Sequence, residues 1–510
     1  MNRVNQSFNN TLWGFAYRFL RMLVPTLFRA YIIRYVGTQY VGLSGFFTSF
    51  LSVLSLSELG FGSAIIFLMY EPIAKNDYVT LNALLKKLRR IYVYVGIVII
   101  LVGCAFYPFL DVLIKIDTET KPNIQLLYAM YLFQVAASYL MFAYRYALLT
   151  AYQRSDIVFK IEFIYSLIEY ALKFIILITT KNFYLHTLVF ALMIIPKNIA
   201  YYTASKKLYP NVYCNGTTTK EQNDYIKAKV ISLFGHRIGA TFMFSIDSVI
   251  ISAFLGITIL AKFDNYNHIM RSVVTFLGVL LTSIVASLGN KLILDSNEKT
   301  YDSFKNATFI WIVIVGWCTN CFLCLFQPFI KWWVGEQLVV DEYVMITIAV
   351  YFFCWQFRQI GLTMKDAAGL WEQDKLKPYI GMILNIGLSV LLVLVSKNII
   401  GVLIPTICIL VFLYFPWETK VLFNSIFQGK QNDYFRFMSR TLISTLIAVV
   451  ATYLVARIMP DSGFGAIALR GVLCCIMMPS IFIVLNLRNP QYDEAKHILV
   501  YAVKRKMHRK

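Results

Sequence analysis

The sequence has few charged residues and lacks the short motifs of common nucleotide and hydrolytic chemistry. Only 15% of its 510 residues are Asp, Glu, Lys or Arg, whereas soluble domains average about 25%. It contains no Gly-x-x-x-x-Gly-Lys-Ser/Thr loop, no Gly-x-Ser-x-Gly elbow and no His-Glu-x-x-His pair. ATP hydrolysis and the familiar hydrolytic sites therefore lack support, and we expect neither an enzyme nor a bound cofactor.

Cysteines are also too few and too scattered to form a disulfide framework. Most of the nine lie inside apolar stretches, where a thiol behaves as a small hydrophobic group. Cys318, Cys321 and Cys324 have the spacing of metal ligands, but they share one apolar run that offers no fourth ligand. We expect ordinary packing there and no metal.

What the sequence does contain is hydrophobic residues, at 58% of the chain with a mean hydropathy of +0.63. Apolar runs long enough to cross a bilayer recur with short polar gaps, which predicts an all-α polytopic membrane protein with about fourteen transmembrane helices. The expected spans are 12–36, 41–69, 91–114, 124–151, 156–179, 184–205, 228–255, 261–288, 306–330, 341–369, 377–396, 399–426, 435–458 and 464–486.

The location of the basic residues predicts the orientation of these spans. Net charge is +21, and Lys and Arg gather in the loops 75–90 and 206–227 and in the tail 496–510. Because positively charged loops stay in the cytoplasm, both termini are predicted to be cytoplasmic. An anionic leaflet explains the basic tail more simply than nucleic acid does, so we expect membrane lipids as partners and no nucleic acid.

Two further patterns concern the organisation of the chain. Segment 76–90 interleaves leucines with cations, which suits a helix lying in the membrane interface and equally a plain connector helix. The segment from Arg29 to Gly37 matches the segment from Ser248 to Gly256 in apolar pattern and terminal glycine. This repeat predicts two pseudo-symmetric six-helix lobes plus two C-terminal helices. The expected parts are an N-terminal lobe with its cytoplasmic linker at 1–227, a second lobe at 228–434, helices 13 and 14 at 435–486 and a basic tail at 487–510.

Ionisable residues inside the spans are the most informative, because each costs roughly 2.5 to 3.5 kcal/mol at mid-helix. Buried cations exceed buried acids along spans one, seven, eight and ten, which predicts a wet cavity that receives an anion such as phosphate. The candidate substrate contacts are Arg18, Arg21, Arg29, Arg237, Arg271 and Arg358. For each arginine, pairing within the protein stays an open alternative.

Some of these charges have evident partners. By depth in the membrane, Glu58 in span two lies level with Arg18 and Arg21 and is expected to pair with them. Glu169 and Lys173 are four residues apart on span five, so we expect them to neutralise one another.

Four stretches give the chain a resemblance to a known family. They are Tyr40-Val-Gly-Leu-Ser-Gly45, Leu54-Ser-Leu-Ser-Glu-Leu-Gly-Phe-Gly-Ser63, Ile246-Asp-Ser-Val-Ile-Ile-Ser-Ala-Phe-Leu-Gly256 and Lys365-Asp-Ala-Ala-Gly-Leu-Trp-Glu-Gln-Asp-Lys-Leu-Lys-Pro378. Through them, and through its number of spans, the sequence resembles the bacterial polysaccharide flippases, which export O-antigen and capsule repeat units. That family belongs to the superfamily that includes multidrug and toxin extrusion proteins.

The resemblance implies a fold, a substrate and a location. It implies two lobes in the bacterial inner membrane that expose a central cationic cavity to each side in turn. The implied substrate is an oligosaccharide repeat unit on undecaprenyl pyrophosphate, with the polysaccharide polymerase and glycosyltransferases of the same pathway as further partners. Glu58 and Asp247 match acidic positions in the resembling stretches, which makes them structural partners or sites for a coupling ion.

Three rival functions remain open. A multidrug exporter of the same architecture should prefer acids in its cavity, because its substrates are mostly cations. A flippase of the peptidoglycan lipid precursor shares the cationic cavity and differs only in substrate. An intramembrane polysaccharide polymerase, from a different class, would need a larger external loop for its acceptor than this sequence offers.

Overall fold

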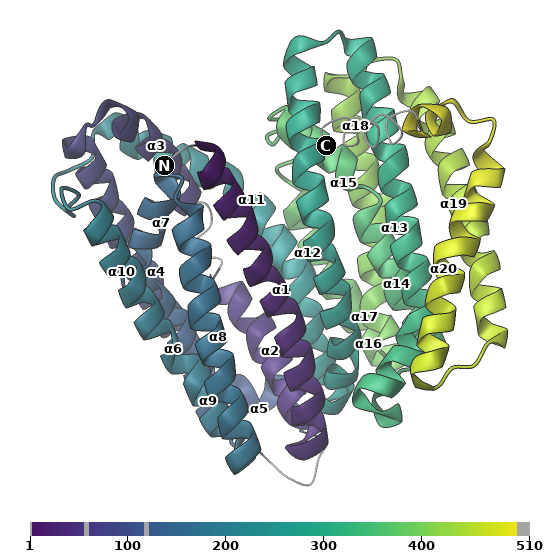
Figure 1. Cartoon of the computed structure of the whole chain (residues 1–510), viewed down its shortest axis with the longest axis horizontal. Helices are drawn as coiled ribbons and strands as arrows, with labels where there is room; N and C mark the ends of the chain where they lie inside the picture. The colour runs from purple at the N-terminus through teal and green to yellow at the C-terminus, as the bar shows by residue number, and fades with distance from the viewer. Residues whose placement is uncertain (1–2, 56–60, 117–121, 497–510) are drawn as a thin grey trace. The chain divides into compact units, whose positions relative to one another are not determined.

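The chain is helical throughout the part that the structure describes. The computed structural model describes residues 3–55, 61–116 and 122–496, and every regular element in these ranges is a helix (Figure 1). By its internal contacts the chain divides into two compact units, Met1–Ala261 and Lys262–Lys510. The boundary predicted between residues 227 and 228 is derived from the sequence repeat, whereas this division is based on contacts. The predicted boundary therefore stays a prediction.

The helices are named here as in Figure 1. The first unit contains α1 (Arg3–Tyr35), α2 (Thr38–Leu54), α3 (Phe61–Lys75), α4 (Tyr78–Phe106), α5 (Leu110–Leu113), α6 (Ile124–Leu140), α7 (Ala143–Ala151), α8 (Ser155–Thr180), α9 (Phe183–Leu192), α10 (Ile194–Leu208) and α11 (Lys220–Ile250). The first residues of α12 (Ile257–Leu294) also belong to it. The second unit continues with α13 (Asn297–Val334), α14 (Glu342–Gln356), α15 (Gln359–Ala367), α16 (Lys377–Ser396), α17 (Ile400–Cys408), α18 (Phe415–Ser425), α19 (Gln431–Ile458) and α20 (Gly463–Asn486).

Within the described residues each predicted span lies on one helix or on consecutive helices, but fewer than fourteen of these stretches are both long and apolar enough to cross a membrane. In the described ranges, nine helical stretches are long and apolar enough to cross a membrane, or ten if the bent pair α6 and α7 forms one span. Helices α1 and α8, which carry charged residues along their length, are not among these stretches. The protein is a multi-pass membrane protein, and the full number of fourteen stays a prediction.

Several of the spans are broken or irregular. Helices α6 and α7 meet at an angle of 49° where Phe142 adopts the left-handed conformation, with φ of 56°. Segments Ile251–Leu255 and Ile409–Tyr414 are π-helical, and the second joins α17 to α18. Such π-turns disturb the regular ladder of hydrogen bonds, and they occur often near functional sites.

The two glycines of the predicted repeat make the same turn. Gly37 and Gly256 both have positive φ, 136° and 100°, and each donates its N–H to the carbonyl five residues earlier, at 2.9 and 3.1 Å. Only glycine adopts this backbone freely, which explains the matching terminal residue. Gly335 makes the same bond after α13 at 3.2 Å, so the turn ends helices generally in this chain and does not by itself establish a repeat.

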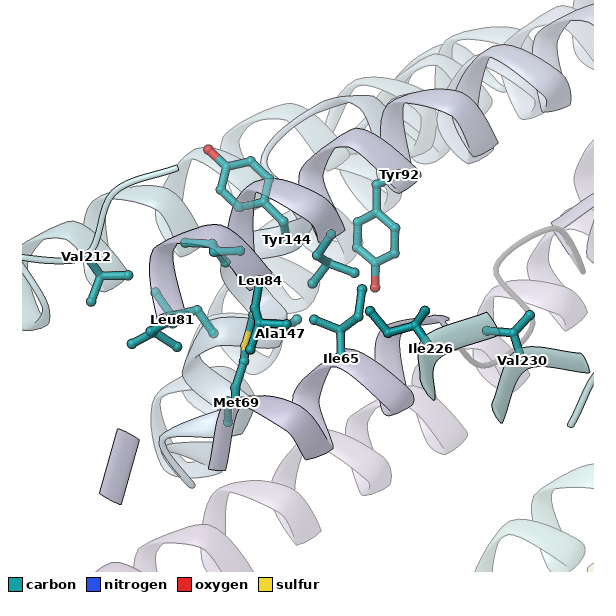
Figure 2. Packing of buried hydrophobic residues seen from close by; sticks show 14 residues of the cluster. Ile65, Met69, Leu81, Leu84, Tyr92, Tyr144, Ala147, Val212, Ile226 and Val230 are labelled. Carbon is teal, nitrogen blue, oxygen red and sulfur yellow. The ribbon is translucent and has the colours of Figure 1, made fainter. Parts of the chain in front are cut away.

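The expected interfacial or connector helix at 76–90 does not exist as a separate element. Those residues form the first half of α4, which continues without a break to Phe106. Leu81, Leu84 and Leu88 are at most 1% exposed, because α3 and α7 cover them. Figure 2 shows Met69 of α3 and Ala147 of α7 beside Leu84. The leucines therefore form a protein core rather than a lipid-facing stripe.

The main helix contacts differ between the two units. In the first unit α1 lies along α8, and α2 packs against α11 (Figure 1). Gly42 permits a close approach of α2 to the start of α12, since a Cβ atom at that position would lie 2.4 Å from the carbonyl oxygen of Ile257. In the second unit α13 is central and contacts α14, α19 and α20. The buried Trp311 on α13 donates its indole N–H to the carbonyl of Gln356 at 2.7 Å.

Candidate functional site

The candidate site in the first unit is built on the contact between α1 and α8. Aromatic rings fill this contact: Trp13 lies 5.7 Å from Phe163, and Phe28 lies 6.0 Å from Tyr170, measured between ring centroids. Gly14 lets the two helices approach, because a Cβ atom there would be 3.2 Å from Phe159. The rings fix the rotation of α1 and hence the direction of its arginines.

Arg18 and Arg21 are both exposed on α1. Arg21 Nη1 donates to the hydroxyl of Tyr17 at 3.1 Å, and that hydroxyl donates to Glu162 Oε2 at 3.0 Å. Arg18 has no hydrogen-bond or ion-pair partner among the residues that the structure describes. On a helix that spans the membrane, as α1 is predicted to do, exposed guanidinium groups require water or an anion, because lipid tails do not solvate a charged group.

Glu162 on α8 is the acidic centre of this site, and sequence reasoning missed it. Besides Tyr17, its carboxylate accepts hydrogen bonds from Tyr201 at 2.6 Å and from Lys197 at 3.4 Å, both on α10. A signal was present, because Glu162 lies seven residues before Glu169 and so shares a face of α8 with it. The same search for ionisable residues within spans would have found it.

Glu169, the second glutamate of α8, also has an ion-pair partner within the protein. Glu169 pairs with Lys173 at 3.3 Å, which confirms the predicted i,i+4 pair. Both carboxylates therefore have a lysine partner, Lys197 for Glu162 and Lys173 for Glu169. Arg18 and Arg21 are left as the excess positive charge of this part of the unit. The arrangement can hold an anion with two guanidinium groups, each of which offers paired N–H donors.

The remaining predicted residues are placed differently. Arg29 is half-buried further along α1, and Arg271 is exposed on α12, where its Nε donates to Asn267 at 3.3 Å. The side chain of Arg237 lies outside what the structure describes, although its backbone belongs to α11. Glu58 lies outside the described residues altogether.

Asp247 is 2% exposed, near the C-terminal end of α11. Serine side chains join α11 to α2 at the same level, with Ser52 and Ser245 2.8 Å apart. Its predicted role, as a structural partner or a coupling-ion site, stays open.

Arg358 has a partner inside its own unit. It is 8% exposed, and its Nη1 lies 2.5 Å from Glu418 Oε1 and 2.7 Å from Oε2. Lys377 contacts the same carboxylate at 2.6 Å. A ligand at Arg358 would have to displace Glu418, so the structure shows the alternative of pairing within the protein.

These contacts belong to a buried network that joins α15, the connection from α15 to α16 and the start of α16 to Glu418 on α18. Asp374 lies 2.6 Å from Lys377 and 3.0 Å from Lys365, and neither Asp374 nor Lys365 is exposed at all. Asp366 at the rim lies 3.1 Å from Lys365, so acids match cations in number. Four of these residues, Lys365, Asp366, Asp374 and Lys377, lie in the stretch from Lys365 to Pro378 that carries the strongest resemblance. The stretch therefore serves to lock helices together rather than to hold an anion.

Comparison with solved structures shows which known fold this arrangement of helices resembles. The chain matches lipid II flippase MurJ in an inward closed conformation with a TM-score of 0.65 at 15% identity, over 94% of this chain and 99% of that one. It matches an inward-facing multidrug resistance MATE family transporter of the MOP superfamily with a TM-score of 0.59 at 15% identity, over 81% and 94%. The chain has the fold of the MOP superfamily. A mutant of the Vibrio cholerae MATE transporter VcmN also shares the MOP fold, with a TM-score of 0.51 at 13% identity over 82% and 97%.

By sequence the chain matches no protein-family model and no curated protein. The structural matches establish the fold alone, because at identities of 13 to 15% they leave the function and the substrate undetermined. The solved structures named here are two transporters and a flippase, and what this chain itself does has to be argued from its own residues.

Proposed function

We propose that the protein is a flippase that translocates undecaprenyl-pyrophosphate-linked oligosaccharide repeat units from the inner to the outer leaflet for surface polysaccharide synthesis. It works by alternating access around a cationic cavity in the bacterial inner membrane, with both termini in the cytoplasm. The sugar headgroup needs such a path, because each unpaired hydroxyl costs kilocalories in hydrocarbon.

One observation carries this proposal: Arg18 and Arg21 are exposed on α1, the first predicted span, and the neighbouring acids of α8 already have lysine partners. A diphosphate offers the negative charge and the acceptor oxygens that two guanidinium groups require. A cationic drug would meet an excess of like charge in the same place, which disfavours a multidrug exporter. The MOP fold supports transport of either kind of substrate.

A flippase of the peptidoglycan lipid precursor is the second candidate, and a specific observation favours it. The lipid II flippase MurJ matches this chain over 94% of its length. Both candidates carry a lipid diphosphate, so the arginines of α1 do not distinguish them. The resemblance of the four sequence stretches favours the polysaccharide substrate.

Deletion in the native bacterium separates the candidates. We expect complete lipid-linked repeat units to accumulate facing the cytoplasm and surface polymer to disappear, while peptidoglycan synthesis continues. The measurement is extraction of lipid-linked glycans combined with a membrane-impermeant sugar-modifying enzyme that reports the leaflet. Repeat units that still reach the outer face unpolymerised would instead indicate the polymerase, and loss of cell-wall synthesis would indicate the peptidoglycan precursor.

A further inference from the structure

The second unit contains another charged site, which is a cavity of about 680 Å³ beside the turn between α19 and α20. Its walls come from α13, α14, α19 and α20, and ligand sites in proteins typically have volumes of about 300 to 1,000 Å³. The charged residues that line it are Lys331, Glu342, Arg457, Asp461 and Arg470.

Arg470 on α20 is the buried cation of this cavity. It is 8% exposed and donates to three backbone carbonyls, those of Met459 at 2.7 Å, Pro460 at 2.9 Å and Cys324 at 3.1 Å. A guanidinium group has five N–H donors, so two remain without an acceptor among the described residues. Arg470 also has no carboxylate within ion-pair distance in that part of the chain. A buried cation with spare donors at a cavity wall is the arrangement expected of an anion site.

The other charges of the cavity are arranged in pairs. Lys331 Nζ lies 2.6 Å from Asp461 Oδ2, and this hydrogen bond holds the pKa of the Asp461 carboxyl below its usual range. Arg457 binds Glu342 through two contacts of 3.0 Å. Each acid of the lining thus has its own cation.

Arg470 is the third cation of the lining, so the cavity keeps one positive charge in excess. Another acid, Glu336, lies 3.5 Å from Lys331, but its side chain is 83% exposed and water screens its charge. A phosphodiester carries one negative charge and would balance the excess.

The surroundings of the cavity indicate that the phosphate belongs to a lipid. Trp332 and Phe464 lie beside the cavity with ring centroids 6.1 Å apart and are 53% and 68% exposed, as expected of aromatic residues at a membrane surface. An exposed apolar row leads away from it along one face of α19, with a spacing of three or four residues. The row consists of Ile447, Val450, Leu454 and Ile458. This row offers a path for an acyl chain.

We propose that this cavity binds the phosphate of a phospholipid headgroup, with Arg470 at its floor and Lys331 and Arg457 at its rim. By the predicted orientation the headgroup belongs to the outer leaflet. The site lies within the second unit alone and does not depend on the proposed transport function. It is separate from the arginines of α1, and it gives the α19 and α20 pair a lipid that fixes its end in the bilayer.

Native mass spectrometry of the purified full-length protein with added phosphatidylglycerol tests the proposal. Replacing Arg470 risks unfolding, because the side chain holds three carbonyls of the fold. We therefore choose the rim pair, Lys331→Gln with Arg457→Gln, which leaves two unpaired acids facing the phosphate. We expect at least about tenfold weaker lipid binding, since each charge-assisted contact is worth about a factor of ten. The matched control, Arg436→Gln with Arg440→Gln, removes two exposed cations at the other end of α19 and should bind as the wild type does.

Two further probes identify the ligand. Diacylglycerol has the same chains without phosphate and should bind at least tenfold more weakly to the wild type. Inorganic phosphate should not displace the lipid at equal concentration. Unchanged phosphatidylglycerol binding by the rim variant, or equal binding of diacylglycerol, would overturn the proposal. Displacement by inorganic phosphate would retain the phosphate chemistry and overturn the lipid as its source.

Discussion

Replacing Glu418 by glutamine is expected to destabilise the protein by about 3 to 5 kcal/mol, because it leaves two buried cations without their shared carboxylate. Arg358 and Lys377 both contact Glu418, and all three side chains are 8% exposed or less. Thermal unfolding of the purified protein in detergent measures the effect. Adding Arg358→Met to Glu418→Gln should restore part of the lost stability, since an apolar side chain needs no counter-charge.

The matched control is Asp366→Asn, at the rim of the same network. Asp366 also binds a cation of the network, Lys365, at 3.1 Å, but its side chain is 46% exposed. Exposed ion pairs contribute about 0 to 1 kcal/mol, so this variant should unfold close to the wild type. Equal and small losses of stability in the Glu418→Gln and Asp366→Asn variants would contradict the structural role assigned to the buried network.

Replacing Arg18 and Arg21 together by glutamine is expected to abolish translocation without unfolding the protein. A hydrogen bond to a charged group contributes about 1.5 to 3 kcal/mol, so each substitution alone should weaken the interaction with the diphosphate by about ten- to a hundredfold. Arg21→Lys should have an intermediate effect, because it keeps the charge and loses the paired donors. The measurement is the concentration of lipid-linked oligosaccharide that gives half-maximal translocation in vesicles of purified protein.

The control for this prediction lies in the same helix. Arg34, in the last turn of α1, is exposed and outside the cationic face, so Arg34→Gln should translocate normally. Thermal unfolding of the Arg18 variant should match the wild type, since that side chain has no partner to lose among the described residues. Normal translocation by the double variant would remove the first helix from the substrate path.

Hydrophobic periodicity predicted the helices well, because a bilayer-length apolar run has few other structures available. It failed at residues 76–90, where leucines mixed with cations favoured an interfacial helix or a connector helix equally and the structure has the first half of a longer, buried helix. What decides the case is the cover that α3 and α7 place over Leu84 and Leu88, and α7 comes from a distant part of the sequence. Hydrophobic periodicity does not predict how the helices pack together, and the comparison with solved structures identified that arrangement.

The candidate site was predicted in part for a similar reason. Unfavourable charges inside spans are visible in a sequence, and that rule found Arg18 and Arg21 on α1. The partners of such charges are not visible in the sequence. Glu418, for example, lies 60 residues from Arg358 and meets it only through tertiary packing. The sequence therefore identified which charges need an explanation, and the structure separated the paired Arg358 from the exposed arginines of α1.

The most direct test of the proposed function is translocation by purified protein in sealed vesicles that contain an undecaprenyl-pyrophosphate-linked oligosaccharide. A membrane-impermeant sugar-modifying enzyme added outside reports how much substrate has crossed. The account predicts that the protein exposes this lipid faster than empty vesicles do, and that the double variant at Arg18 and Arg21 does not. Transport of a cationic dye with no movement of the lipid-linked oligosaccharide would contradict it.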